Sequence, residues 1–257
     1  MTPDVVARYL ERIGLPPEPP RPTLDVLRTL QLAHLRTVPF ENLSIHLGEP
    51  VDLDEDALVR KIVDRRRGGF CYELNGLFAA LLRALGYDVD LLAAQVFGDD
   101  GPGIPLDHLA LRVRLDEPWL VDVGFGRSHH RPLGLARRDE QPDPDGVYTV
   151  RDAPYGDLDV LRDGASQLRL DARPRELSEF VPTCWWHSTS PGSHFTRGDV
   201  CSLLLPDGGR VTLTGSTLTR TAADGTRTTT GVPDPLATYE ELFGIRLDRP
   251  PAPTAAP

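Results

Sequence analysis

The feature that most constrains the fold is a change in hydrophobic pattern at Gly86 and Tyr87. Before this point apolar residues recur at the three- to four-residue spacing of amphipathic helices. After it, short runs rich in β-branched residues partly alternate between apolar and polar positions, as in strands. The sequence therefore predicts an α+β protein with a helical first third and a β-rich remainder.

Four helices are predicted in the first third, and capping residues mark their ends. Thr2 and Thr23 each precede an apolar-periodic run, where a hydroxyl can accept a hydrogen bond from a free backbone N–H. Gly68 and Gly69 are expected to stop the third helix, and Gly86 to cap the fourth. The predicted helices cover residues 2–14, 23–38, 54–65 and 71–86.

Short strands and hairpins are predicted after residue 87. The expected strands are YDVDLLAAQVFG, HLALRVRL, WLVDVGF and GVYTVRD. DLDVLRDGASQLRL and CSLLLPDGGRVTLTG are typical of hairpins, and ADGT of a further turn. A last helix, ATYEELFG, follows Pro235, and the proline-rich end RPPAPTAAP is expected to be disordered.

Composition and charge narrow the class of partner. A formal net charge of -10 disfavours nonspecific attraction to nucleic acid or anionic lipid, so small molecules or proteins are the expected partners. No secretory leader or membrane span is recognisable, which predicts a cytoplasmic protein. The three cysteines, Cys71, Cys184 and Cys201, are too few and too widely spaced for a disulfide framework or a zinc site, and no metal is expected.

Cys71 is the first candidate for chemistry. It stands where a helix begins, close to unpaired backbone N–H groups and the positive end of the helix dipole. Such a position, with a neighbouring imidazole, can lower a thiol pKa by several units and produce a strong nucleophile. A buried cysteine that packs as a small apolar side chain is the alternative interpretation.

His108 and Asp122 are the residues that could activate this thiol. His108 opens a strand after a glycine- and proline-rich loop, and Asp122 lies in a strand that otherwise looks buried, where a carboxylate needs a partner. A Cys71-His108-Asp122 triad supplies that partner, with His108 as the base and Asp122 orienting it. The triad requires a three-residue loop or a bulge between the strands, because a two-residue turn at Asp116 and Glu117 would place the two side chains on opposite faces.

With these residues in place, the sequence resembles the arylamine N-acetyltransferase family. The resemblance covers nearly the whole chain, and its strength lies in the order of its segments more than in any one of them. The matching segments are VPFENL (38–43), RGGFCYELN (67–75), HLALRV (from 108), VDVGFG (121–126), STSPGSHF (188–195) and FGIRL (243–247).

The resemblance implies a three-part architecture and a division of the chain. It implies an N-terminal helical bundle that carries the nucleophile (1–86), a β-barrel that carries the histidine and the aspartate (87–190), and a short mixed α/β lid (191–247). A disordered tail (248–257) would follow, and the triad would be papain-like. The helical and β-rich parts read from the residues agree with this division.

The resemblance also implies a reaction and further site residues. In this family the cysteine takes an acyl group from a thioester, commonly acetyl-coenzyme A, and passes it to an aromatic amine or hydrazine. Phe40, Phe125 and Gly126 would line the acceptor pocket, and Glu41 would pair with Arg67 to support the loop beneath Cys71. No bound cofactor is expected. Phe40 and Phe125 as plain core residues remain the alternative.

One departure keeps a second function open. After the FGI segment the sequence continues with RLDRPPAPTAAP, where proline excludes the further helix of many bacterial members. In this respect it resembles the amide synthases of ansamycin-type pathways, which use the same triad to release a carrier-bound polyketide as a macrolactam. The donor is therefore either acetyl-coenzyme A or an acyl carrier protein thioester. A papain-like or transglutaminase-like hydrolase and a noncatalytic binding module are more distant alternatives.

Overall fold

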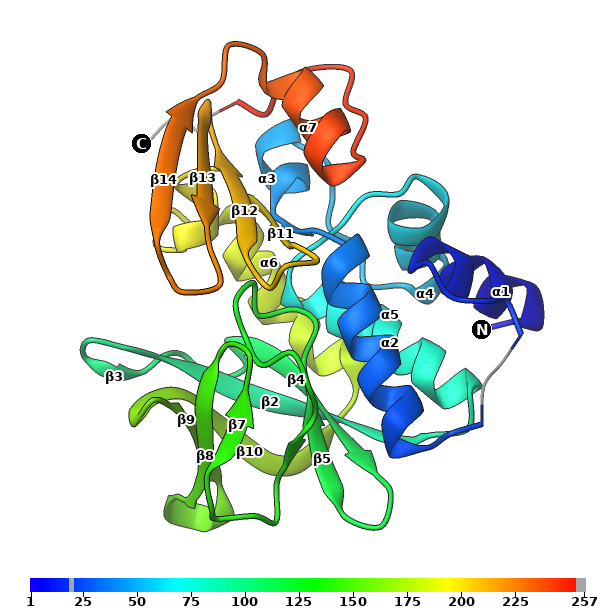
Figure 1. The fold of residues 1–257 in the computed structure, drawn as a ribbon, viewed down its shortest axis with the longest axis vertical. Helices are drawn as coiled ribbons and strands as arrows, with labels where there is room; N and C mark the ends of the chain where they lie inside the picture. The colour runs from blue at the N-terminus through cyan, green and yellow to red at the C-terminus, as the bar shows by residue number, and fades with distance from the viewer. Residues whose placement is uncertain (19–20, 253–257) are drawn as a thin grey trace.

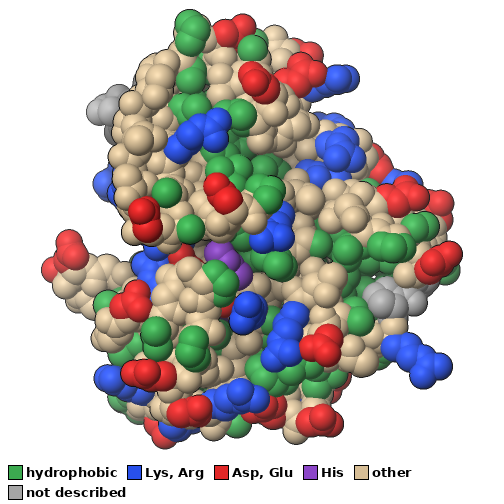
Figure 2. Space-filling view, viewed as in Figure 1, with side chains coloured by type: hydrophobic (Ala, Val, Ile, Leu, Met, Phe, Trp, Pro, Cys, Tyr) green, Lys and Arg blue, Asp and Glu red, His purple; other side chains and the backbone are tan. Residues whose placement is uncertain are grey.

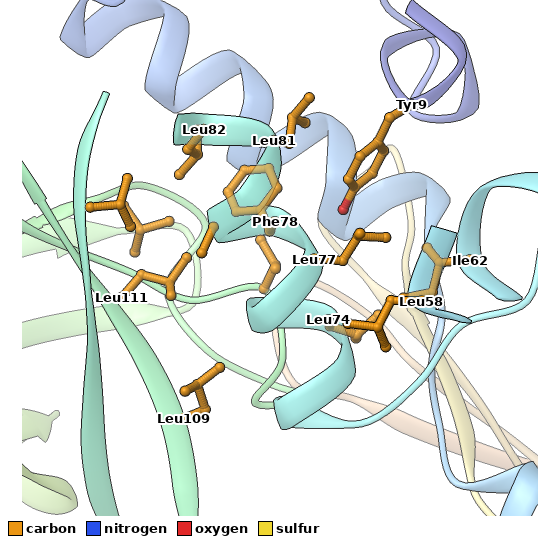
Figure 3. Close-up of a cluster of buried hydrophobic side chains, with 14 of the residues drawn as sticks. Tyr9, Leu58, Ile62, Leu74, Leu77, Phe78, Leu81, Leu82, Leu109 and Leu111 are labelled. Carbon is orange, nitrogen blue, oxygen red and sulfur yellow. The ribbon is translucent and has the colours of Figure 1, made fainter. Parts of the chain in front are cut away.

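Helix α5 (Cys71–Ala84) lies at the centre of the computed structural model, which describes residues 1–18 and 21–252. Apolar residues occupy most of its length, as expected for a helix buried on every side. Figure 3 shows its side chains between apolar residues of other helices (Tyr9, Leu58, Ile62) and of a neighbouring strand (Leu109, Leu111). The helix predicted from Cys71 is confirmed, and Gly86 follows its end in the left-handed region at φ 90°.

The first two predicted helices are confirmed together with their caps. The hydroxyl of Thr2 accepts a hydrogen bond from the N–H of Val5, and that of Thr23 from the N–H of Val26. The third predicted helix is present as α4 followed directly by the π-helix η1, whereas α3 was not predicted. The bounds are α1 (Pro3–Arg12), α2 (Leu24–Thr37), α3 (Leu43–Leu47), α4 (Glu55–Leu58) and η1 (Val59–Asp64).

The two glycines before Cys71 have a different role from the one predicted. Helix η1 ends at Asp64, and it is Arg66, at φ 53°, that takes the left-handed conformation beyond it. A Cβ atom on Gly68 would lie 1.9 Å from the carbonyl oxygen of Pro39, and one on Gly69 would lie 2.7 Å from the carboxylate of Glu73. The glycines are therefore required by close packing beneath α5, and they do not stop the helix.

Nine strands form one strongly curved sheet, drawn at the bottom of Figure 1. Its strand order is β6-β5-β4-β2-β10-β9-β8-β7, with β3 paired to β2. The predicted hairpin about Asp163 and Gly164 is confirmed as β9 and β10. The bounds are β2 (Asp88–Gly98), β3 (Gly101–Pro102), β4 (His108–Arg114), β5 (Pro118–Val121), β6 (Leu133–Gly134), β7 (Gln141–Asp143), β8 (Gly146–Asp152), β9 (Leu158–Arg162) and β10 (Ala165–Arg175), with the 3₁₀ turn η2 (Pro154–Gly156) between β8 and β9.

A side chain joins the two ends of this sheet into a nearly closed barrel. Gln141 of β7 accepts a hydrogen bond of 2.7 Å from the N–H of Gly134 in β6 and donates one of 3.1 Å to its carbonyl. Residues of seven strands fill the interior, including Ala94, Ala110 and Tyr148. Because the glutamine satisfies backbone groups at the sheet edge, the barrel closes without a continuous strand ladder at this point.

A second, five-stranded sheet lies above the barrel in Figure 1, with helix α7 against it. Its order is β1-β11-β12-β13-β14, so the short strand β1 from the N-terminal third forms one edge. The predicted hairpin, the ADGT turn and the last helix are all confirmed. The bounds are β1 (Phe40–Glu41), β11 (Cys201–Leu204), β12 (Arg210–Thr214), β13 (Thr217–Thr221), β14 (Arg227–Gly231) and α7 (Pro235–Phe243).

The segment between the two sheets contains helices that were not predicted. These are η3 (Leu177–Phe180), α6 (Val181–Thr189) and η4 (His194–Thr196). Part of the expected tail is also ordered, because the N–H of Ala252 donates to the carbonyl of His46 at 3.1 Å. Residues 253–257 lie outside the described residues, and the division into three domains stays a prediction.

The glycine packing beneath α5 can be tested by adding one methyl group. Gly68→Ala should lower the free energy of unfolding by about 2–3 kcal/mol, because the new Cβ overlaps the Pro39 carbonyl. Gly98→Ala is the matched control, since its Cβ would meet no atom within 4 Å, and it should stay within about 0.5 kcal/mol. Urea denaturation measures both, and equal stability of the two variants would contradict this role of Gly68.

Candidate active site

Cys71 is the first residue of α5 and is buried, at 3% exposure. Gly124, in the turn after β5, lies directly against it. A Cβ atom on Gly124 would be 2.8 Å from the Cα of Cys71 and 2.8 Å from the amide nitrogen of Asn75. The predicted segment VDVGFG therefore contributes a glycine whose lack of a side chain lets the barrel approach the start of the helix, a role that sequence reasoning missed.

His108 and Asp122 lie together as the triad prediction requires. The Nε2–H of His108, the first residue of β4, donates to Oδ2 of Asp122 at 2.7 Å. The loop between β4 and β5 has three residues, Leu115 to Glu117, so Leu111 pairs with Val121. This register brings Asp122 diagonally across from His108 on the same face, as the three-residue alternative predicted. The pair is buried, and Nδ1 of His108 remains for another partner.

Asn75 connects the aspartate to the helix that carries the cysteine. Its amide nitrogen donates to Oδ1 of Asp122 at 2.8 Å and to the carbonyl of Leu109 at 2.6 Å. Its oxygen accepts from the N–H of Val123 at 2.9 Å. Sequence reasoning missed Asn75, although it stands four residues after Cys71 and thus on the same face of the helix.

The pKa shifts of the two acidic groups differ in direction. Burial raises the pKa of Asp122, but His108 and the hydrogen bond from Asn75 outweigh it and hold the pKa below its usual range. Asp122 is therefore ionised at neutral pH. Burial raises the pKa of the Cys71 thiol well above its ordinary value, although a hydrogen bond from the backbone of Leu109 opposes this.

Burial therefore opposes the pKa lowering predicted for Cys71 from the helix N-terminus and a neighbouring imidazole. A lone thiolate in this buried position would be an uncompensated charge, and Asp122 and Asp107 add repulsion. A thiolate paired with a protonated imidazole avoids that cost, because the two opposite charges compensate one another. Ionisation of Cys71 therefore depends on a proton acceptor within the same cavity.

Cys71 and His108 line one cavity of about 520 Å³. Phe40 and Phe125 line it as well, and the ring of Phe125 meets that of His108 edge to face at 5.2 Å between centroids. Gly126 does not line this cavity but a neighbouring one, which it shares with Phe40. Further lining residues include Asn42, Val96, Asp107, His194, Phe195 and Asp199.

Buried His187 and half-buried Asp107 form a second pair at the wall of this cavity. Nε2 of His187 lies 3.1 Å from Oδ1 of Asp107, and Nδ1 lies 3.2 Å from Oγ of Ser193. The other oxygen of Asp107 accepts from the N–H of Val96. The pair joins α6 to the strand that begins with His108. In the sequence, the only sign of this pair is that Asp107 directly precedes His108.

Glu41 and Arg67 are paired as expected, beneath the loop that precedes Cys71. Oε1 of Glu41 lies 3.0 Å from the guanidinium of Arg67, and Oε2 accepts from the N–H of Leu43 at 2.7 Å. Both side chains are buried. Burial raises the pKa of Glu41, but Lys61 and Arg67 reverse the effect and keep the pKa below its usual range.

A second buried ion pair fixes the first turn of α5. Nζ of Lys61 in η1 lies 2.6 Å from Oε1 of Glu73, whose other oxygen accepts from the N–H of Phe70. Glu73 thereby satisfies one of the free N–H groups at the start of the helix. Its negative charge also interacts favourably with the positive end of the helix dipole. Two neighbouring ion pairs thus hold both sides of the loop before Cys71.

Residues 1–18 and 21–252 contain no group of three or more His, Cys, Asp or Glu side chains that could hold a metal ion. In the same part of the chain, no helix combines the length and the apolar character needed to cross a membrane.

Comparison with known proteins identifies the family. The sequence model described as N-acetyltransferase matches residues 23–252. An arylamine N-acetyltransferase / N-hydroxyarylamine O-acetyltransferase from Salmonella typhimurium is 36% identical over 238 residues, 88% of this chain and 84% of the relative. The chain belongs to the arylamine N-acetyltransferase family. The family prediction made from the ordered segments is confirmed, and with it the prediction that the protein is an acyltransferase.

Solved structures of family members share the fold. The arylamine N-acetyltransferase of Salmonella typhimurium superposes with a TM-score of 0.87 at 34% identity, covering 95% of this chain and 92% of that one. The Mycobacterium marinum enzyme, solved in complex with CoA, has a TM-score of 0.84 at 34% identity and covers 93% and 92%. The mixed α/β fold with a nearly closed barrel is therefore that of the arylamine N-acetyltransferases.

The buried pair beneath Cys71 gives a stability prediction. Glu41→Gln should lower the free energy of unfolding by about 3–5 kcal/mol near neutral pH, because Arg67 and Lys61 lose a buried counter-charge. The loss should shrink as pH falls below about 4.3, where unfolded glutamate takes up a proton that folded Glu41 resists. Thermal unfolding across pH measures this difference.

The control is Glu240→Gln, in an exposed pair with Arg246. It should change the free energy of unfolding by less than about 0.5 kcal/mol at every pH. A Glu41→Gln variant as stable as this control would show that the buried pair does not support the loop.

Proposed function

We propose that this protein transfers an acetyl group from acetyl-coenzyme A to an aromatic amine through an acyl-cysteine at Cys71. The observation that carries the proposal is the shared cavity of Cys71 and His108, in which His108 donates to buried Asp122 through Nε2 at 2.7 Å. Membership of the arylamine N-acetyltransferase family supports acetyl transfer as the overall reaction. Cys71 is then the nucleophile, His108 the base and Asp122 the group that orients it.

In the first half-reaction the thiol proton moves from Sγ of Cys71 to Nδ1 of His108. The thiolate attacks the thioester carbonyl, the bond between that carbon and the donor sulfur breaks, and the protonated imidazole returns its proton to the leaving thiolate. Asp122 keeps its negative charge throughout, because its pKa lies below the usual range, and it stabilises the imidazolium while it exists. The exchange of one thioester for another is nearly balanced in free energy.

In the second half-reaction the amine attacks the acyl carbon of Cys71. The new C–N bond forms as the C–S bond breaks, and His108 takes the proton that the amine loses and returns it to the sulfur. Phe40 and Phe125 flank this point with aromatic surface, which suits an aromatic acceptor ring. The backbone N–H groups at the start of α5 are the expected donors to the transient oxyanion.

Coenzyme A is the donor that the comparisons favour. The Mycobacterium marinum relative was solved in complex with CoA, and this chain covers 92% of that structure. A carrier-bound acyl thioester, as an amide synthase would use, calls for the same triad chemistry. The identity of the donor that acylates Cys71 therefore separates the two functions.

Incubation with acetyl-coenzyme A in the absence of an amine should add one acetyl group, which intact-protein mass spectrometry measures. Peptide mapping should place the group on Cys71, and Cys71→Ala should remain unmodified. Cys184→Ala, which removes another buried thiol, is the matched control and should be acetylated as fully as the unmodified protein. Addition of an aromatic amine should then remove the group and release the amide.

Two outcomes would contradict the proposal. Acetylation that persists in Cys71→Ala would exclude this cysteine as the carrier. Absence of an adduct with acetyl-coenzyme A, together with an adduct from an acyl carrier protein thioester, would favour the amide synthase.

A further inference from the structure

A second cavity, of about 540 Å³, adjoins the catalytic one. Phe40 and Val200 line both cavities, so they form the boundary between them. The second cavity lies between loops of the barrel, at Gly126 and Asp145, and the five-stranded sheet. Figure 2 shows a histidine and basic side chains where the upper and lower parts of the molecule meet.

The one carboxylate that lines this cavity among the described residues is already neutralised. Oδ1 of Asp145 lies 2.7 Å from Nε of Arg127, and Oδ2 lies 2.8 Å from Nη1 of Arg162. The hydroxyl of Tyr148 also donates to Oδ2 at 2.8 Å. Two arginines and a tyrosine therefore share this carboxylate, and no ion pair among the described residues joins it to a third cation.

Arg210 is that third cation. It extends from β12 into the cavity, and within the described part of the chain its guanidinium makes one hydrogen bond, to Oγ of Ser202 at 3.1 Å, and no ion pair. Burial lowers the pKa of Arg210 to about 10; the charge of Asp145 opposes this shift, and that of Arg127 acts in the same direction as burial. The guanidinium remains protonated at neutral pH and keeps most of its five donors unused.

The other titratable groups at this cavity do not supply a counter-charge. His130 is buried, and burial lowers its pKa, which favours the neutral imidazole. Arg227, from β14, is a further cation at the rim. The cavity therefore has a net positive charge, although the whole protein has a formal net charge of -10.

We propose that this cavity binds an anionic group of one of the two substrates, a carboxylate or a phosphate, and that Arg210 is the residue that anchors it. The proposal rests on the proposed acyl transfer and makes it more specific. A planar guanidinium matches two oxygens of a carboxylate or phosphate, and a partly buried cation without an ion-pair partner gains from such a ligand. The anion can come from the acceptor amine or from the phosphates of the donor.

The boundary at Phe40 explains why one molecule can use both cavities. Phe40 lines both the cavity of Cys71 and the cavity of Arg210, so a substrate ring that packs against it can extend into both. Gly126 stands at the same boundary in the left-handed region, at φ 80°, which favours glycine, and a Cβ atom there would contact the Phe40 ring at 3.5 Å. The catalytic cavity then selects the aromatic amine, and the adjoining one selects its charge.

Steady-state kinetics of Arg210→Met test this proposal with two acceptors and two donors. The acceptors are para-aminobenzoate and its neutral analogue para-aminobenzamide; the donors are acetyl-coenzyme A and phosphate-free para-nitrophenyl acetate. If the acceptor supplies the anion, kcat/KM for para-aminobenzoate should fall about 10- to 100-fold, whereas kcat/KM for para-aminobenzamide should change less than about twofold. If the donor supplies it, the loss should follow acetyl-coenzyme A and be absent with para-nitrophenyl acetate.

Arg220→Met is the matched control, because it removes the same charge from an exposed position on the adjacent strand β13 that does not line the cavity. It should leave all four combinations unchanged. If Arg210→Met does not fold, Arg210→Lys, which keeps the charge but loses the planar fork, should show a smaller loss for the same substrate.

An equal change for charged and neutral substrates, or no change in any combination, would overturn the role of Arg210. Failure of the proposed acyl transfer is a separate result. In that case the unmodified protein would form no acetylated amine with any combination of donor and acceptor.

Discussion

The structure depends on one buried hydrogen-bond chain, from Asn75 through Asp122 to His108. Asn75 belongs to the helix that begins with Cys71, whereas Asp122 and His108 belong to the barrel. Each side-chain polar atom of Asn75 and Asp122 is hydrogen-bonded, so the carboxylate can stay ionised without contact with water. The same bonds that join the helix to the barrel therefore set the tautomer of the histidine and leave its Nδ1 for another partner.

Much of this arrangement follows from the sequence for local reasons. Caps at Thr2 and Thr23 place the helices, and the Asp163-Gly164 turn fixes a hairpin, because these signals act over a few residues. The triad was also predictable in outline, since a carboxylate in an apolar strand needs a partner. Whether His108 and Asp122 lie on the same face depended on the length of the loop between β4 and β5. That loop has three residues, which is the length that the triad requires.

The features that could not be predicted depend on contacts between distant segments. Gly68 looked like a helix stop, but it is required by the carbonyl of Pro39, which approaches from another part of the chain. Asn75 gave no signal apart from its position one turn after Cys71. The burial that raises the pKa of the Cys71 thiol could not be predicted either, because the sequence indicated the helix terminus and not the depth of burial. Burial is a property of the assembled fold.

The central claim is that buried Cys71 ionises only by giving its proton to His108. Thiolate absorbance as a function of pH tests this most directly, measured as the difference between the protein and its Cys71→Ala variant, with and without His108→Gln. The account predicts a thiolate at neutral pH that His108→Gln abolishes. A Cys71 thiolate that appears only well above the free-cysteine pKa of about 8.5, or that persists unchanged in His108→Gln, would contradict it.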